Sequence, residues 1–127
     1  MKIIQAQEKP YRVRLAELPI DSENIFLYHK TTIREMYPSS SNTSFDDVLL
    51  YNERGEITEF TIGNVVTEIN GQLWTPPISC GLLAGTFRKH LLETEKIKER
   101  IIYKEELPQC SKIYLVNSVR KWVEVEF

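Results

Sequence analysis

The sequence predicts an α+β fold in which a curved, mostly antiparallel sheet packs on helices. Three observations predict this fold: strand patterns outnumber helical ones, the strands follow one another closely as in a meander, and two segments have helical character. The chain has 127 residues, of which 42% are hydrophobic. A chain of this size buries well over half of the surface that its unfolded form exposes. We therefore expect a single domain over residues 1–127 with one core.

Each expected strand is an apolar or alternating run bounded by turn residues. They lie at residues 12–17, 25–29, 47–52, 56–60, 64–69, 72–75, 100–104 and 112–117, and the alternating end at 123–127 adds another. Arg54-Gly55 is expected as a turn, and Asn70-Gly71 is the dipeptide that best supplies the two positive φ angles of a tight hairpin. Pro76-Pro77 should end the ladder that precedes it, because proline lacks a backbone N–H.

Helical segments are fewer. We expect a short helix at 31–37, a polar, serine-rich loop at 38–46 and a turn of helix near 105–107. A longer helix is expected at 85–96, since Leu83, Phe87 and Leu91 recur at i, i+4 and i+8.

Charge and cysteine content exclude several classes of function. Sixteen basic and 18 acidic residues give a net charge of −2, without a long block of like charge, so we expect no nucleic-acid partner. No apolar stretch approaches the roughly 18 residues of a membrane helix, and the N-terminus lacks a secretory apolar run, so we expect a cytoplasmic protein. Cys80 and Cys110 have no C-x-x-C spacing, which favours reduced thiols and no metal site.

Lys30 is a candidate for covalent chemistry. It follows the apolar and aromatic run 25–29 and precedes a polar segment, so it is expected at the end of a buried strand. A strand end holds a reactive group rigidly, and a primary amine can condense with an aldehyde. The alternative is a solvated lysine, which is the usual state of this residue type.

Glu59 is the second candidate, in a strand where its neighbours Thr58 and Phe60 create apolar surroundings. A buried carboxylate without a partner takes up a proton, whereas a protonated pyridine nitrogen keeps it ionised. The alternative is a surface glutamate in a chain with 18 acidic residues.

The third candidate is the glycine-bounded segment 81–88. Gly81 and Gly85 allow close backbone approach just before the expected helix. The first N–H groups of a helix lack partners inside it, so Thr86 and Phe87 can donate to a phosphate. The alternative is a tight loop before a core helix. Together, an amine, an acid and an anion cradle fit the flat, anionic, aldehyde-bearing cofactor pyridoxal 5'-phosphate.

Six segments, in order and with compatible gaps, resemble the class IV pyridoxal-phosphate enzymes, the aminotransferase class IV family. They are YHKTT at 28–32, NERGEITE at 52–59, GNVV at 63–66, TPP at 75–77, CGLLAGTFR at 80–88 and VNSVR at 116–120. The resemblance covers about residues 25–123 and implies the large C-terminal domain of that fold. Within that family, the six segments look most like the 4-amino-4-deoxychorismate lyases. In particular, they resemble the form fused to the C-terminal end of the chorismate-using component I of para-aminobenzoate synthase.

The resemblance also implies roles for individual residues. Lys30 would condense with the cofactor and move protons, and Glu59 would pair with the ring nitrogen. The groups implied to hold the phosphate are the backbone amides of Ile62, Gly63, Thr86 and Phe87 and the hydroxyl of Ser118.

Two features depart from the family pattern. Glu35 stands where related aminotransferases place a tyrosine against the phenolic oxygen of the cofactor, a contact that Tyr37 or Arg34 would have to replace. Only some 24 residues precede the first matched strand, so the smaller N-terminal domain, with its phosphate-binding arginine, is expected to be absent. The chain would then be cut from a longer fusion, or have lost that domain.

The implied activity is release of pyruvate and 4-aminobenzoate from aminodeoxychorismate, in folate precursor synthesis, by a homodimer fused to a chorismate-binding domain. One alternative is an amino acid aminotransferase of the same family. Another is a folded subunit-contact module without catalysis, because the isolated chain is expected to be inactive without its N-terminal half.

Overall fold

The computed structural model describes residues 11–22 and 46–127. Its strands are β1 (Tyr11–Leu15), β2 (Asp47–Tyr51), β3 (Ile57–Phe60), β4 (Asn64–Ile69), β5 (Gln72–Thr75), β6 (Lys98–Glu99), β7 (Lys112–Asn117) and β8 (Lys121–Glu126). Its helices are η2 (Ile78–Cys80), α3 (Thr86–Glu93) and η3 (Lys104–Gln109), of which η2 and η3 are 3₁₀ helices. The strand expected at 25–29 and the helix expected at 31–37 lie outside the described residues.

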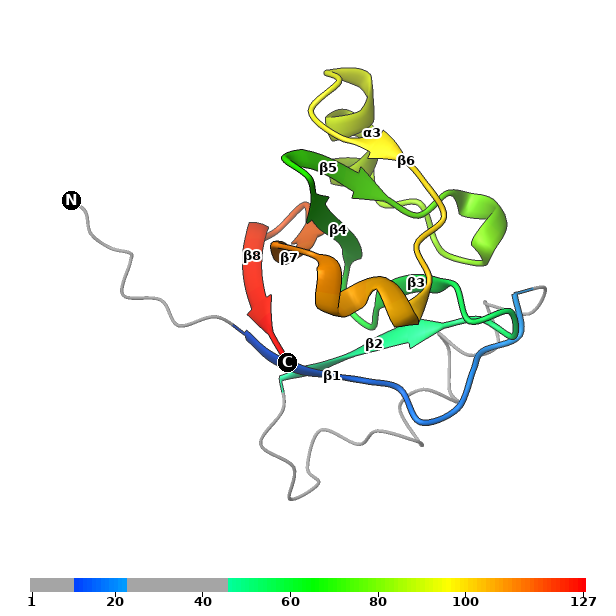
Figure 1. Cartoon of the computed structure of the whole chain (residues 1–127). Helices are drawn as coiled ribbons and strands as arrows, with labels where there is room; N and C mark the ends of the chain where they lie inside the picture. Colours follow the sequence, from blue (N-terminus) through cyan, green and yellow to red (C-terminus); the bar gives the residue numbers. More distant parts are fainter. Residues whose placement is uncertain (1–10, 23–45) are drawn as a thin grey trace.

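The sheet closes on itself. Its strand order is β3-β2-β1-β8-β7-β4-β5-β6, and β3 also pairs with β4. Six strands therefore form a ring, and β5 and β6 extend it from β4 (Figure 1). Five strand pairs are antiparallel and three are parallel, so the expectation of a curved, mostly antiparallel sheet is confirmed. Closure of the ring was not part of that expectation.

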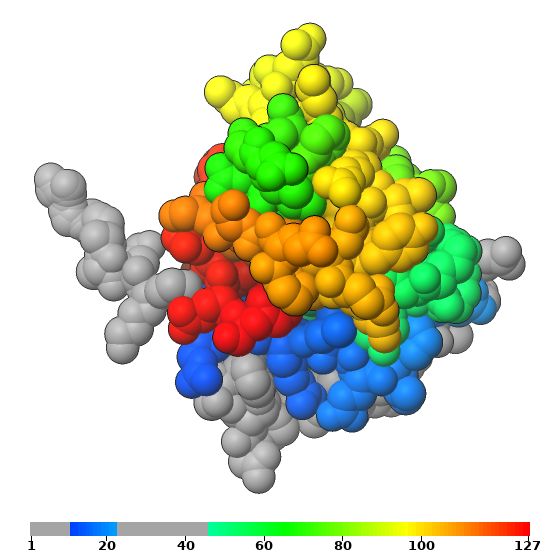
Figure 2. Space-filling model, in the orientation of Figure 1, coloured from blue at the N-terminus to red at the C-terminus, as the bar shows by residue number. Residues whose placement is uncertain are grey.

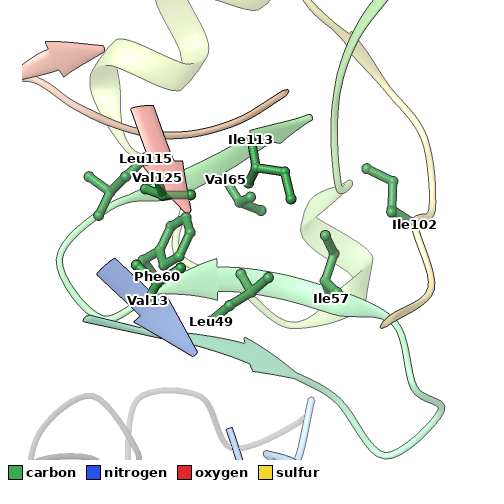
Figure 3. Packing of buried hydrophobic residues seen from close by; sticks show 9 residues of the cluster. All are labelled: Val13, Leu49, Ile57, Phe60, Val65, Ile102, Ile113, Leu115 and Val125. Atoms are coloured by element: carbon green, nitrogen blue, oxygen red, sulfur yellow. The ribbon is translucent and has the colours of Figure 1, made fainter. Parts of the chain in front are cut away.

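Apolar side chains fill the interior of this barrel. They come from all six strands of the ring and from the segment after β6, and Figure 3 shows them pointing towards one another. The cluster consists of Val13, Leu49, Ile57, Phe60, Val65, Ile102, Ile113, Leu115 and Val125. Because side chains alternate along a strand, the neighbours of these residues point outward. The interior is therefore a packed core that leaves ligand binding to the outer surface.

The outer surface is covered in two places. Leu91 of α3 packs with Val66 of β4 and Val116 of β7, so the helix lies against the outside of the barrel. Ala16 and Ile20, after β1, cover Val48 on the outside of β2. In Figures 1 and 2 the orange segment that contains η3 lies over the near face of the barrel.

Two expected elements need correction. Residues 100–104 do not form a strand: the paired segment is β6, and after it only Tyr103 forms an isolated bridge, with Glu56. The apolar pattern there reflects burial of Ile102 in the barrel core. The carbonyl of Ile102 accepts the N–H of Ile57 at 2.8 Å. The helix expected at 85–96 begins as predicted but ends at Glu93, and η2 was not expected.

The predicted turns are confirmed. Asn70 and Gly71 have φ angles of 54° and 81°, which lets β4 turn directly into β5. Gly55 has a φ of 80°, and its N–H donates to the carbonyl of Asn52. Strand β5 ends at Thr75, immediately before the two prolines.

Candidate functional site

A pocket of about 270 Å³ lies on the outside of the barrel, where three separate segments meet. They are the β3–β4 turn, the segment that leads into α3 and the β7–β8 turn. The lining residues are Glu59, Phe60, Thr61, Ile62, Gly63, Asn64, Leu83, Ala84, Gly85, Thr86, Asn117 and Ser118. This volume is close to the lower end of the roughly 300–1,000 Å³ of small-molecule sites.

A β-bulge places Glu59 in this pocket. Two residues of β3, Thr58 and Glu59, stand opposite the single residue Leu50 of β2. The extra residue allows Ile57 and Phe60, three positions apart, both to enter the barrel core. Regular alternation would have turned Glu59 into the core alongside Ile57. The bulge turns it to the outer face instead, where it contributes to the pocket wall.

Glu59 is buried, with 3% of its surface exposed. Its Oε1 accepts the backbone N–H of Leu83 at 3.3 Å, and its partner across the β3–β4 ladder is Asn64. A buried carboxylate favours a cationic partner, because paired charges lose less on desolvation than an isolated one. This side chain is thus a candidate for binding a cationic ring nitrogen.

Asn64 fixes the segment that leads into α3. Its Nδ2 donates to the carbonyl of Leu83 at 2.9 Å, and its Oδ1 accepts the N–H of Gly85 at 3.1 Å. A Cβ atom on residue 85 would lie 2.7 Å from that Oδ1, so only glycine fits the contact without a shift. The sequence analysis missed Asn64. Its signal is a polar residue that begins a strand of buried apolar residues and so needs hydrogen-bond partners.

The first turn of α3 begins at the pocket, where Thr86 is part of the wall. Gly85 is the N-cap and makes no side-chain cap, and the first turn contains no acidic residue. The N–H of Lys89 is the first that bonds back to Gly85, at 3.1 Å. The amides of Thr86 and Phe87 have no partner inside the helix and can donate to an anion, supported by the helix dipole.

The β3–β4 turn supplies the second set of amides. It packs tightly on β7, since a Cβ atom on Gly63 would lie 2.6 Å from the carbonyl oxygen of Val116. On one side Asn117 holds the turn, with its Nδ2 donating to the carbonyl of Ile62 at 2.9 Å. Irregular backbone held in this way keeps its N–H groups out of the sheet ladder and able to bind an anion.

On the other side the turn is held by Asp47, a buried residue at the start of β2. Its Oδ1 accepts both the N–H and the hydroxyl of Thr61, at 3.1 and 2.6 Å. Burial raises the pKa of the Asp47 carboxyl, and the N–H and hydroxyl of Thr61 and the backbone N–H groups of Val48 and Ile62 offset part of that rise. The sequence analysis also missed this residue.

The structure brings most of the predicted site residues together. Glu59, Ile62, Gly63, Thr86 and Ser118 all line the pocket. Ser118 is exposed, in the turn after β7.

The structure does not bring Phe87 into the lining of the pocket, and it does not describe Lys30. The ring of Phe87 packs edge-on against Trp122, 6.2 Å between centroids. Lys30, Glu35 and their neighbours lie outside the described residues.

Other kinds of site find no support within residues 11–22 and 46–127. There, no group of three or more metal-binding side chains is gathered. None of the helices in this part of the chain is long and apolar enough to cross a membrane.

The chain is similar to known proteins along most of its length. A Schizosaccharomyces pombe protein named "Putative aminodeoxychorismate lyase" is 40% identical over 129 residues, which cover 93% of this chain and 56% of that protein. A Mesorhizobium loti structure described as "Putative amino-acid aminotransferase" has 38% identity and a TM-score of 0.80, covering 95% of this chain and 61% of that one. The chain thus spans little more than half the length of these relatives.

A structural likeness extends to more distant proteins. The 4-amino-4-deoxychorismate lyase from Pseudomonas aeruginosa has a TM-score of 0.74 at 18% identity, over 92% of this chain and 46% of that one, and shows the shared fold. The sequence profile of class IV amino-transferases matches residues 3–126. Proteins of this family are pyridoxal-phosphate enzymes. With nearly its whole length matched, the chain belongs to the class IV aminotransferase family.

Proposed function

We propose that this chain is the cofactor-binding part of a pyridoxal-phosphate-dependent 4-amino-4-deoxychorismate lyase, which releases pyruvate and 4-aminobenzoate. One observation carries the proposal: a buried carboxylate, Glu59, and two amide-bearing turns line the same pocket. The likeness to the S. pombe protein, at 40% identity, supports the choice of reaction.

The pocket fits the two ends of the cofactor. Glu59 would accept a hydrogen bond from the protonated ring nitrogen, which keeps both charges paired in a buried place. The phosphate would receive the amides of the β3–β4 turn, Ile62 and Gly63, and those of the first turn of α3, Thr86 and Phe87. Ser118 would add a hydroxyl from the β7–β8 turn.

Bound pyridoxal phosphate withdraws electrons from the substrate carbon that bears the amino group, which makes its proton easier to remove. Lys30 would hold the cofactor covalently before the substrate arrives. Once freed, its Nζ would take that proton. Loss of the enolpyruvyl group with its ether oxygen then leaves an aromatic ring and, after protonation, pyruvate.

Absorbance and covalent trapping test the cofactor site. Mixed with pyridoxal phosphate, the protein should absorb near the edge between the ultraviolet and the blue, and borohydride should fix the cofactor on Lys30, as peptide mass spectrometry would show. Lys30→Ala should lose both signals. Lys112→Ala, an exposed lysine in β7, should retain them and is the matched control. A label that stays in Lys30→Ala would refute the assignment of that lysine.

Glu59→Gln tests the ring-nitrogen contact. The variant keeps the size of the side chain and some cofactor binding, but a neutral amide cannot hold the ring nitrogen protonated. Turnover of the complete polypeptide should fall by several orders of magnitude, because the pairing stabilises charge that develops during proton removal. Near wild-type turnover in a steady-state pyruvate assay would contradict this role.

Amino acid transamination is the second candidate reaction, and the 38% identity to the M. loti protein favours it. The two reactions share Lys30 and Glu59 but differ in products. Supplying aminodeoxychorismate alone, and separately an amino acid with a ketoacid, distinguishes them. The lyase releases pyruvate from the first, whereas an aminotransferase exchanges amino groups in the second.

The assembly is also a proposal. We propose a homodimer in which each subunit needs the smaller N-terminal domain of the family for activity, in a cytoplasmic polypeptide fused to a chorismate-binding domain. Light scattering tests the dimer, and the coding sequence upstream of Met1 tests the fusion. If neither domain is encoded there and the chain turns over neither substrate, a non-catalytic subunit-contact module becomes the better description.

A further inference from the structure

The β3–β4 turn is held by a side chain from a different strand. Its closing backbone bond runs from the N–H of Phe60 to the carbonyl of Gly63 at 2.8 Å, which leaves Thr61 and Ile62 at the corners. Such a short turn can tilt its peptide planes, and with them the direction of its amides. A second constraint is needed to fix that direction.

Asp47 supplies the constraint. Strand pairing places Leu49 beside Phe60, so Asp47, two residues earlier, lies at the level of the β3–β4 turn, where its side chain meets Thr61. The two hydrogen bonds from Thr61 to its Oδ1 hold both the backbone and the side chain of that corner. The same oxygen accepts the N–H of Val48 at 2.6 Å, which holds the carboxyl group itself in place.

The cost of this arrangement indicates a role beyond packing. Asp47 is 5% exposed, and its Oδ2 has no hydrogen-bond partner among the residues that the structure describes. A half-satisfied buried carboxyl is unfavourable for folding, and an apolar residue of the same shape would avoid that penalty. Fixing the turn is the benefit that the contacts of Asp47 show.

We propose that Asp47 is a positioning residue for anion binding, which holds the corner of the turn at Thr61 and so aims the amide of Gly63. This inference rests on the proposed function, because it assumes that the amide of Gly63 receives the phosphate of the cofactor. It adds a residue that touches neither the cofactor nor the substrate.

Two substitutions of Asp47 separate its effect on the position of the turn from its effect on the stability of the protein. Asp47→Asn keeps an oxygen that can accept from Thr61, whereas Asp47→Leu keeps the shape and removes the acceptor. Asp46 offers a matched control, because its exposed carboxylate accepts the N–H of Arg12 at 2.9 Å and does not hold the turn. Asp46→Leu should therefore leave the turn unchanged.

The first measurement needs no cofactor. In amide NMR spectra, Asp47→Leu should shift the Ile62 and Gly63 resonances and speed their hydrogen exchange, while Thr86, in α3, stays as in the wild type. Asp47→Asn should restore the wild-type pattern. If Ile62 and Gly63 are unchanged in Asp47→Leu, the positioning role is wrong. Should Asp47→Leu fail to fold, Thr61→Val, which removes only the hydroxyl donor, must produce the same shifts in weaker form.

The second measurement is the affinity for pyridoxal phosphate and for inorganic phosphate by calorimetry. Loss of a positioning hydrogen bond should weaken both by about tenfold in Asp47→Leu, and by less than about threefold in Asp47→Asn. Equal affinity in Asp47→Leu and wild type would overturn the proposal. Wild-type protein that binds neither ligand would overturn both the cofactor site and this proposal. Wild-type binding with unaffected Asp47→Leu would overturn this one alone.

Discussion

Gly85 lies so close to Asn64 that the pocket wall has no space for a Cβ atom at position 85. We therefore expect even Gly85→Ala to disturb this wall. In Gly85→Ala the new atom would lie 2.7 Å from Asn64 Oδ1, well inside an ordinary carbon–oxygen contact. The Asn64 side chain must then move, which breaks its bond from Gly85 and strains its bond to Leu83. Moving the backbone instead would shift the start of α3.

The magnitude follows from those two hydrogen bonds. Each contributes about 1 kcal/mol, and leaving the amide of buried Asn64 without a partner costs about 1–3 kcal/mol. Replacing glycine restricts the unfolded chain, which offsets about 0.4–1 kcal/mol. We expect Gly85→Ala to lower the free energy of unfolding by about 2–3 kcal/mol.

A double-mutant cycle gives the decisive assay. In an Asn64→Ala background the clash and both hydrogen bonds are already absent, so Gly85→Ala should cost close to zero. Urea unfolding can be followed by tryptophan fluorescence, because Trp122 contacts Phe87 in the first turn of α3. The expected coupling energy is about 2–3 kcal/mol. Additive effects of the two substitutions would refute the inferred contact.

Three further predictions concern buried polar groups. Burial raises the pKa of Asp47. Between the ordinary and the raised pKa, the unfolded chain releases the Asp47 proton and the folded protein keeps it. The contribution of Asp47 to the free energy of unfolding therefore falls as pH rises through that window. The unfolding free energy of Asp47→Asn relative to wild type should therefore rise across the window and then level off; parallel profiles would contradict this. Burial, together with the adjacent Glu56 carboxylate, raises the pKa of Cys80 to about 12. On the order of one thiol in ten thousand is then ionised at pH 8, and iodoacetamide should label Cys80 only after unfolding, as mass spectrometry can show. Arg88→Ala should cost about 3–5 kcal/mol in urea unfolding, because it empties a buried site and leaves the carbonyl of Pro76 unpaired. Glu99→Gln should cost about 1 kcal/mol or less, since that carboxylate is half exposed, and equal costs would argue against this account.

Local sequence patterns predicted the elements whose causes are local. The hairpin at Asn70-Gly71 and the helix start at Gly85 both follow from the conformational preferences of one or two residues. Closure of the barrel could not be predicted in this way, because it depends on long-range pairing between β1 and its neighbours β2 and β8. Burial of Ile102 is a similar case. Its apolar character predicted a strand, although the segment packs Ile102 into the barrel core and pairs only through the isolated bridge at Tyr103.

The residues of the candidate site also differ in how far local sequence patterns could predict them. Glu59 was identified by type and context, but its position depends on a bulge whose only trace in the sequence is the three-residue spacing of Ile57 and Phe60. Asp47 and Asn64 were missed because their importance lies in contacts with segments 14 and 21 residues away. No local pattern specifies such partners.

Barrel closure explains why the pocket lies where it does. Packed apolar side chains leave no room inside the barrel, so polar chemistry must use its outer wall. Pairing of Asn64 with Val116 brings the start of β4 beside the end of β7, and with them the turns that precede and follow these strands. Both turns leave the ladder there and are held by side chains at the strand ends. Asp47 accepts the N–H of Thr61, and Asn117 donates to the carbonyl of Ile62. A buried acid and two turns outside the ladder therefore meet at one point because β4 pairs with β7, which ties the proposed chemistry directly to the fold.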